Sequence, residues 1–244
     1  MTATAFIAGV APAVAWMGLF WWWDRHDREP LRLILVLFLV GAIPVGFLAG
    51  FVNSRLAAAG LSLFVMAVIV APIGEESLKY LGAKITVRKS RAFDEPVDGM
   101  VYGTAVGLGF AAAENIGYLV WTAMQVTGRV DLIPECVGRT PEECALILVL
   151  PIRAIGTTLV HGLASGLAGF TLSKRRFVGV ISLPYARLPG LLAAIVLHSA
   201  WNLTSGLGQP SPLLIAALGA TAYATVFKAC LRISPHAVAR LKSR

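Results

Sequence analysis

The apolar residues of this chain come in long, nearly uninterrupted blocks, and this feature restricts its fold more than any other. Several blocks hold 18 or more residues, enough for a helix that crosses a hydrocarbon core of about 30 Å. Of the 244 residues, 57% are hydrophobic and 14% are charged, whereas a soluble domain would have about 25% charged residues. We therefore predict an all-α integral membrane protein.

The blocks predict a polytopic bundle of about seven transmembrane helices, forming a single membrane domain over residues 1–244. The first span is expected to remain in the mature protein, because no Lys or Arg precedes it and no small-residue cleavage site follows it. The expected spans are roughly 4–23, 31–52, 61–82, 99–122, 145–172, 189–207 and 211–231.

The basic residues predict the orientation of this bundle. Sixteen of the 21 Lys and Arg follow the first, third, fifth and seventh spans, whereas the loops on the other side hold Arg55, Arg129 and Arg139. The positive-inside rule then places the N-terminus outside and the C-terminus inside the cell membrane. The net charge of +8 is explained by this topology and by contact with anionic lipid headgroups, so nucleic acid is not expected as a partner.

Two of the three cysteines, Cys136 and Cys144, fall in the predicted outer loop 123–144. Their eight-residue separation permits a disulfide, and the outside of a bacterial-type membrane permits it chemically. Cys230 lies near the inner face and is expected to be a lone thiol.

Polar side chains interrupt four of the predicted spans. An ionisable group in a membrane core costs about 2.5–3.5 kcal/mol on insertion scales, so it indicates a functional site by default. The set comprises Glu75, Glu76, Lys79, Glu114, Asn115, Arg153, His161, His198 and Asn202.

Helical geometry predicts how part of this set is arranged. Glu75 and Lys79 are four residues apart, so they share a helix face and can pair. Glu75 and Glu76 project about 100° apart, so one is expected to face the reaction space and the other a helix contact. At about 1.5 Å of rise per residue, one of these glutamates should lie level with His161 and His198, with Glu114 nearer the outer face.

A carboxylate beside imidazoles in a low-dielectric cavity can activate water, and Lys79 could keep such a base ionised. The pair His198 and Asn202 could donate hydrogen bonds to a developing oxyanion. Structural readings stay open: Glu114 and Asn115 could tie helices together, and the charges of the third span could form a structural cluster. Arg153 is expected to snorkel or to pair with acids of the outer loop.

Four short patterns in separate spans resemble the motifs of the PrsW family of intramembrane proteases, which is related to the CAAX-protease and bacteriocin-processing (CPBP) superfamily. The charged loop that ends at Pro30 is also similar, so the resemblance covers about residues 25–202. The patterns are Glu75–Glu76–x–x–Lys79, Phe110–x–x–x–Glu114–Asn115, His161, and His198–x–x–x–Asn202.

The resemblance implies an endopeptidase that hydrolyses peptide bonds of membrane-protein substrates, such as single-span anti-sigma-factor-like proteins. One glutamate of the doublet, Glu75 by preference, would activate water with help from His161. His198 and Asn202 would hold the oxyanion. The role of Glu114 stays open between base, proton relay and helix tie.

Other mechanisms and functions remain as alternatives. Metal-free glutamic catalysis, with no cofactor, is favoured over a zinc enzyme, because the HExxH signature of helical zinc proteases is missing. A proton-coupled transporter would also need buried Glu, His and Lys, although no inverted repeat is evident. A b-haem carrier would use His161 and His198 as axial ligands. The zinc alternative would use Glu75, Glu76, His161 and His198.

Overall fold

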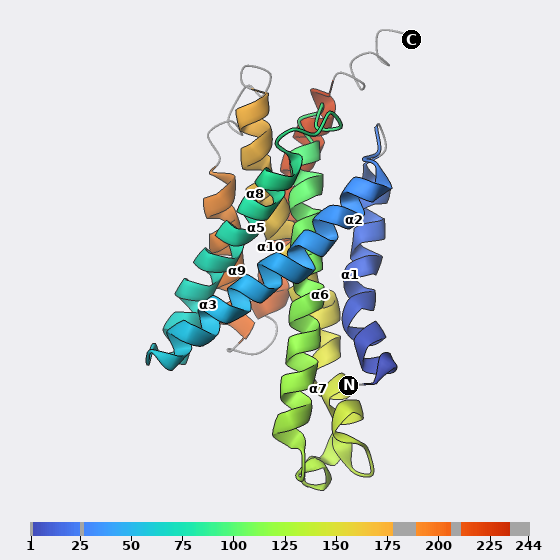
Figure 1. Ribbon diagram of the computed structural model, residues 1–244, viewed down its shortest axis with the longest axis vertical. Coiled ribbons are helices and arrows are strands. Elements are labelled where there is room, and N and C mark those ends of the chain that lie inside the picture. Colours follow the sequence, from blue (N-terminus) through green and yellow to red (C-terminus); the bar gives the residue numbers. More distant parts are fainter. Residues whose placement is uncertain (1, 25–26, 178–188, 206–210, 235–244) are drawn as a thin grey trace.

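The computed structural model describes residues 2–24, 27–177, 189–205 and 211–234, and within them it shows helices and no strands (Figure 1). The predicted all-α membrane bundle is confirmed. Its rods are α1 (Ala3–Trp23), α2 (Leu31–Val40) continued by α3 (Gly46–Ala58), α4 (Leu63–Val65) continued by α5 (Ala71–Val87), α6 (Asp98–Val126), α7 (Pro141–Ile152) continued by α8 (Thr158–Arg176), α9 (Gly190–Ser205) and α10 (Ser211–Arg232).

These seven rods coincide with the seven predicted spans, and residues 206–207 of the sixth span lie outside the described residues. Four rods end at least four residues later than predicted: α3 at Ala58 instead of 52, α5 at Val87 instead of 82, α6 at Val126 instead of 122 and α8 at Arg176 instead of 172. Within the described part of the chain, four segments are long and apolar enough to cross a membrane. They are Ala3–Trp23, Leu31–Ala58, Pro141–Arg176 and Ser211–Arg232.

Three rods are interrupted by a π-helical turn, at Gly41–Val45, Met66–Val70 and Arg153–Thr157. Each turn contains a proline or lies within two residues of one: Pro44, Pro72 and Pro151. Proline lacks a backbone N–H and disturbs the regular hydrogen-bond ladder. Such turns re-aim a helix and often occur at functional sites.

The rods alternate in direction. The C-terminal ends of α1, α5, α8 and α10 lie at one end of the bundle. The N-terminus and the connection between α6 and α7 lie at the opposite end (Figure 1). The described basic residues that follow these four helices therefore lie at one end, as the predicted topology requires. Several of that group, such as Arg25 and Arg187, lie outside the described residues. At the opposite end a disulfide joins Cys136 and Cys144, whose Cα atoms are 5.1 Å apart.

Helix α6 is the centre of the bundle, and it packs against α8 through small residues. A Cβ atom added at Gly103 would collide with the carbonyl of Ser165, and one added at Gly169 would collide with the carbonyl of Gly99. These glycines therefore allow the two helix backbones to approach closely. This contact sets the level at which polar side chains of α6 and α8 meet.

Replacing Gly103 by alanine should lower the stability of the bundle by about 1–3 kcal/mol, the usual cost of overpacking a filled core. Gly18→Ala is the matched control, because a Cβ there meets nothing within 4 Å. Thermal unfolding of both variants in detergent tests this prediction. Equal melting temperatures would show that the α6–α8 contact is loose.

Four acidic side chains, Asp24, Glu29, Glu95 and Asp98, are buried at the end of the bundle where α6 begins. The Tyr102 hydroxyl donates to Glu29 at 2.6 Å. Burial raises the pKa of Asp24 from its ordinary value of 3.8 to about 7, and the nearby carboxylates of Glu95 and Asp27 add to this shift.

Because ionised Asp24 is disfavoured in the folded state, stability should fall as the pH rises from about 4 through about 7. Asp24→Asn should therefore raise the melting temperature at about pH 8 and change it little at about pH 4. Asp131→Asn, in the exposed outer connection, is the control. A gain for Asp24→Asn that is equal at both pH values would contradict this account.

Candidate active site

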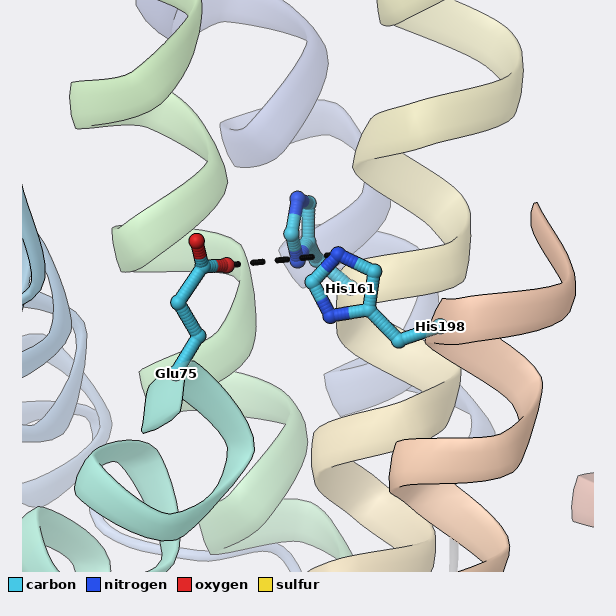
Figure 2. Close-up of side chains that lie close together, drawn as sticks. All are labelled: Glu75, His161 and His198. Atoms are coloured by element: carbon cyan, nitrogen blue, oxygen red, sulfur yellow. Dashed lines mark ion pairs between the residues drawn. The ribbon is translucent and has the colours of Figure 1, made fainter. Parts of the chain in front are cut away.

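Four helices bring the predicted site residues together inside the bundle. Glu75, His161 and His198 converge from α5, α8 and α9 (Figure 2), and each is at most 4% exposed. The residues that meet here are Glu75, Glu76 and Lys79 of α5, Phe110, Glu114 and Asn115 of α6, His161 of α8 and His198 of α9.

Glu76 is fully buried, and both of its carboxylate oxygens are bound. Lys79 Nζ lies 2.5 Å and His198 Nδ1 3.0 Å from Oε1, and the Ser165 hydroxyl donates to Oε2 at 3.0 Å. Lys79 therefore pairs with Glu76 instead of Glu75, the partner that the four-residue spacing also allows. The two glutamates project about 100° apart. Lys79 pairs with Glu76, the one that points toward Ser165 of α8 and His198 of α9.

Lys79 also fixes His161. Its ammonium group lies 3.1 Å from His161 Nδ1, and because an ammonium group can only donate, Nδ1 accepts. His161 Nε2 then carries the proton and donates to Glu114 Oε2 at 2.8 Å. The Lys79 ammonium also lies 4.3 Å from the centre of the Phe110 ring, which is a cation–π contact.

Glu114 lies level with His161, and the expectation that it sits nearer the outer face is wrong. The reason is the position of the helix ends. Counted at about 1.5 Å per residue from the observed inner ends, Glu75 lies about 18 Å deep, His161 about 22 Å and Glu114 about 24 Å.

Arg153 was expected to snorkel or to pair with outer-loop acids, and this expectation is also wrong. The side chain is buried, and its Nη2 lies 2.5 Å from Glu114 Oε2 while Nε donates to Asn115 Oδ1 at 2.8 Å. The guanidinium also lies 4.0 Å from the centre of the Tyr118 ring. The signal that could have predicted this burial is the depth of Arg153 in the membrane, because it comes 12 residues after the first residue of α7.

Asn115 ties helices together. Its Nδ2 donates to the Gly9 carbonyl of α1 at 3.2 Å and to the Thr158 hydroxyl of α8 at 3.0 Å. Asn115 therefore connects α1, α6 and α8 and supports Arg153, which lines the cavity.

Glu75 is the glutamate that faces open space. Its Oε1 accepts from Asn53 Nδ2 at 3.0 Å, and its buried Oε2 has no hydrogen-bond partner among the described residues. Oε2 lies 3.9 Å from His198 Nε2 (Figure 2). Sequence reasoning missed Asn53, because the predicted span ended at residue 52 whereas α3 continues to Ala58.

Glu75 lines a cavity of about 820 Å³ that is also bounded by Glu114, Arg153, His198 and Asn202. The Asn202 side chain donates through Nδ2 to the Ala67 carbonyl at 2.8 Å, in the π-helical turn before α5. One of its two amide protons is therefore already engaged.

Two histidines and one carboxylate form a common ligand set for catalytic zinc. Single donor atoms of Glu75, His161 and His198 lie within 4.8 Å of one another. Glu76, a fourth member of the predicted alternative set, has both oxygens engaged and lies outside this group. Glu75 and His198 offer free lone pairs, whereas His161 would have to give up Lys79 or Glu114 to bind a metal.

Comparison with known proteins identifies the family of this chain. The sequence profile described as "PrsW family intramembrane metalloprotease" matches residues 29–230. The chain belongs to the PrsW family. It is 32% identical to Protease PrsW of Bacillus subtilis (strain 168) over 195 residues, 79% of this chain and 76% of the relative. It is 35% identical to Protease PrsW of Geobacillus kaustophilus over 172 residues, 70% of this chain and 69% of that protein.

No solved structure matches this chain. Membership in the PrsW family confirms the predicted resemblance and makes the chain a multi-pass intramembrane protease that acts on membrane proteins in a lipid bilayer. The family thus favours a protease over a transporter. The rings of His161 and His198 have centres 4.7 Å apart, too close to bind opposite faces of a haem.

Removing the Arg153 guanidinium should leave the Glu114 carboxylate largely buried without its cation. Arg153→Ala should therefore lower stability by about 3 kcal/mol, the low end of the range for broken buried ion pairs. The control is Arg129→Ala, at an exposed position in the outer connection, which should change stability by less than about 0.5 kcal/mol. Thermal unfolding in detergent measures both, and equal stability of the two variants would show that the Arg153 pair contributes nothing.

Proposed function

We propose that Glu75 activates the water that hydrolyses the peptide bond of a membrane-protein substrate. One observation carries this proposal: Glu75 lines the cavity, and its buried Oε2 has no hydrogen-bond partner among the described residues. A general base must reach the proton that it removes without first breaking another bond. Glu75 meets this condition.

The charges around Glu75 support the same assignment. Lys79 pairs with Glu76, and Arg153 pairs with Glu114. Of the three carboxylates, Glu75 is therefore the one that no described lysine or arginine contacts as an ion pair. The paired residues hold the helices in place, and Glu75 remains available for proton transfer.

His198 is the second group that would orient the water. Because its Nδ1 lies 3.0 Å from the Glu76 carboxylate, the neutral ring carries its proton on Nδ1 and has a lone pair on Nε2. A water that donates to both Glu75 Oε2 and His198 Nε2, each at about 2.8 Å, spans the 3.9 Å between these two atoms. In this neutral form His198 accepts a hydrogen bond and does not donate to an oxyanion.

The reaction then needs two proton transfers. As the water oxygen bonds to the scissile carbonyl carbon, Glu75 takes one water proton and the carbonyl electrons move to its oxygen. When the carbon–nitrogen bond breaks, protonated Glu75 gives that proton to the leaving amine. The second amide proton of Asn202 and the Arg153 guanidinium, both on the cavity wall, are the donors suited to hold the oxyanion.

Metal-free catalysis is part of this proposal, and it is supported by the engagement of both His161 nitrogens. Zinc is the alternative, in keeping with the description of the family as metalloproteases. Glu75, His161 and His198 would hold the ion, which would supply a bound water with a pKa of about 7. Lys79 would then have to leave His161 Nδ1, or Glu114 would have to leave Nε2.

Membranes from cells that express the wild-type chain or Glu75→Gln provide the test. New protein N-termini within or beside membrane spans are labelled and counted. Glu75→Gln should reduce their formation by at least about 10²-fold, the usual contribution of a general base, and should leave the melting temperature unchanged.

Glu135→Gln, at an exposed position of the outer connection, is the matched control and should cleave like the wild type. Cleavage by Glu75→Gln at the control rate would refute the assignment of the base.

A further inference from the structure

A second cavity, of about 490 Å³, runs between α3 and α6 and reaches Glu75. Its two long walls consist of small residues at a spacing of four, with Gly46 and Gly50 on α3 and Ala113 and Gly117 on α6. In Figure 1, α3 crosses α6 obliquely and diverges from it toward the end of the bundle that holds the N-terminus. We call this cavity the α3–α6 groove.

Helix packing explains Gly46, where an added Cβ would press on Ala113, but it does not explain the other two glycines of this groove. A Cβ atom added at Gly50 or at Gly117 would meet nothing within 4 Å. At Gly103 of α6, by contrast, it would collide with the backbone of α8. Glycine in a helix costs about 1 kcal/mol relative to alanine. Gly50 and Gly117 therefore destabilise their helices, and no close helix contact offsets this cost.

Polar groups at the end of the groove that reaches Glu75 indicate that its occupant is a peptide. Glu75, Glu114 and Asn53 line the groove, and Glu75 Oε2 is buried there without a hydrogen-bond partner among the described residues. Nearer the surface the lining is aromatic, with Tyr118 and Trp121 exposed. A membrane peptide needs an apolar approach and polar partners where its backbone is cut.

We propose that the α3–α6 groove is the lateral entrance for the substrate and seats an unwound segment of its membrane span, with Gly50 and Gly117 leaving room for the side chains that flank the scissile bond. This inference rests on the function proposed above and adds the route to the site and the determinants of substrate choice.

The requirement for an unwound segment follows from backbone chemistry. In a helix each carbonyl is hydrogen-bonded within the chain and covered by side chains, so attack by water requires local unwinding. Unwound backbone in lipid must find new hydrogen-bond partners. Asn53 and Glu114 offer such partners, and glycine walls allow a backbone to approach closely.

Filling the groove should therefore change which bonds are cut. In the N-terminal labelling experiment, Gly50→Leu and Gly117→Leu should lower cleavage at bonds flanked by large side chains by about tenfold or more, a typical effect of lost pocket volume. Bonds flanked by Gly, Ala or Ser should be cut nearly as in the wild type.

Gly18→Leu is the matched control, since Gly18 lies in a membrane helix remote from the groove and also faces open space. Two results would overturn the proposal: the same bonds cut at the same rates in Gly117→Leu and Gly18→Leu, or a uniform loss at all bonds. A uniform loss would fit a lipid chain in the groove. Equal cleavage by the wild type and Glu75→Gln would instead refute the proposed function.

Photo-cross-linking tests the groove without relying on cleavage. A benzophenone amino acid replaces Trp121 or, as the control, the exposed Leu19 of α1, both in the Glu75→Gln background. The probe is a synthetic single-span peptide with an alanine–leucine core, reconstituted with the protein in phosphatidylethanolamine–phosphatidylglycerol bilayers. Peptide cross-links stronger at position 121 than at 19 support the proposal, and equal signals or lipid adducts alone contradict it.

Discussion

A buried lysine holds this site together. Lys79 places its ammonium group between the Glu76 carboxylate and the His161 ring. Moving an ion from water into a low-dielectric interior costs several kcal/mol, so Lys79 is tolerated because it is paired there. Glu76 in turn holds His198, and one cation thereby joins α5, α8 and α9. Glu76 is engaged in these contacts, whereas Glu75 lines both cavities. The two glutamates of the doublet therefore have different surroundings.

The packing of α6 on α8 places the other half of the site. Because glycines let these two backbones touch, Glu114 reaches His161 and Arg153 reaches both Glu114 and Asn115. Not all glycines serve this purpose. Those that meet backbone hold the bundle closed, whereas Gly50 and Gly117 border open space beside Glu75. The same residue type thus builds the core in one place and leaves a groove in another.

The rods and the members of the site could be predicted from sequence, because long apolar blocks and charges within them carry strong free-energy costs. The side chain with which each site residue pairs could not be predicted in this way. The spacing allows Lys79 to pair with either glutamate of the doublet, three or four residues before it, and the direction of each glutamate decides between them. The level of Glu114 depended on helix ends that hydropathy locates only within a few residues. Asn53 was missed because α3 continues past the predicted span to Ala58, and Arg153, a member of the predicted set, pairs with Glu114 and Asn115 instead of outer-loop acids.

The central claim is that Glu75 and His198 hold the reactive water between them without a metal. The most direct test is a high-resolution experimental map of the purified protein, prepared without chelators, with elemental analysis of the same sample. The account predicts a water within hydrogen-bond distance of Glu75 Oε2 and His198 Nε2, Lys79 in contact with His161, and no stoichiometric zinc. Zinc bound by Glu75, His161 and His198, with Lys79 or Glu114 displaced from His161, would contradict it.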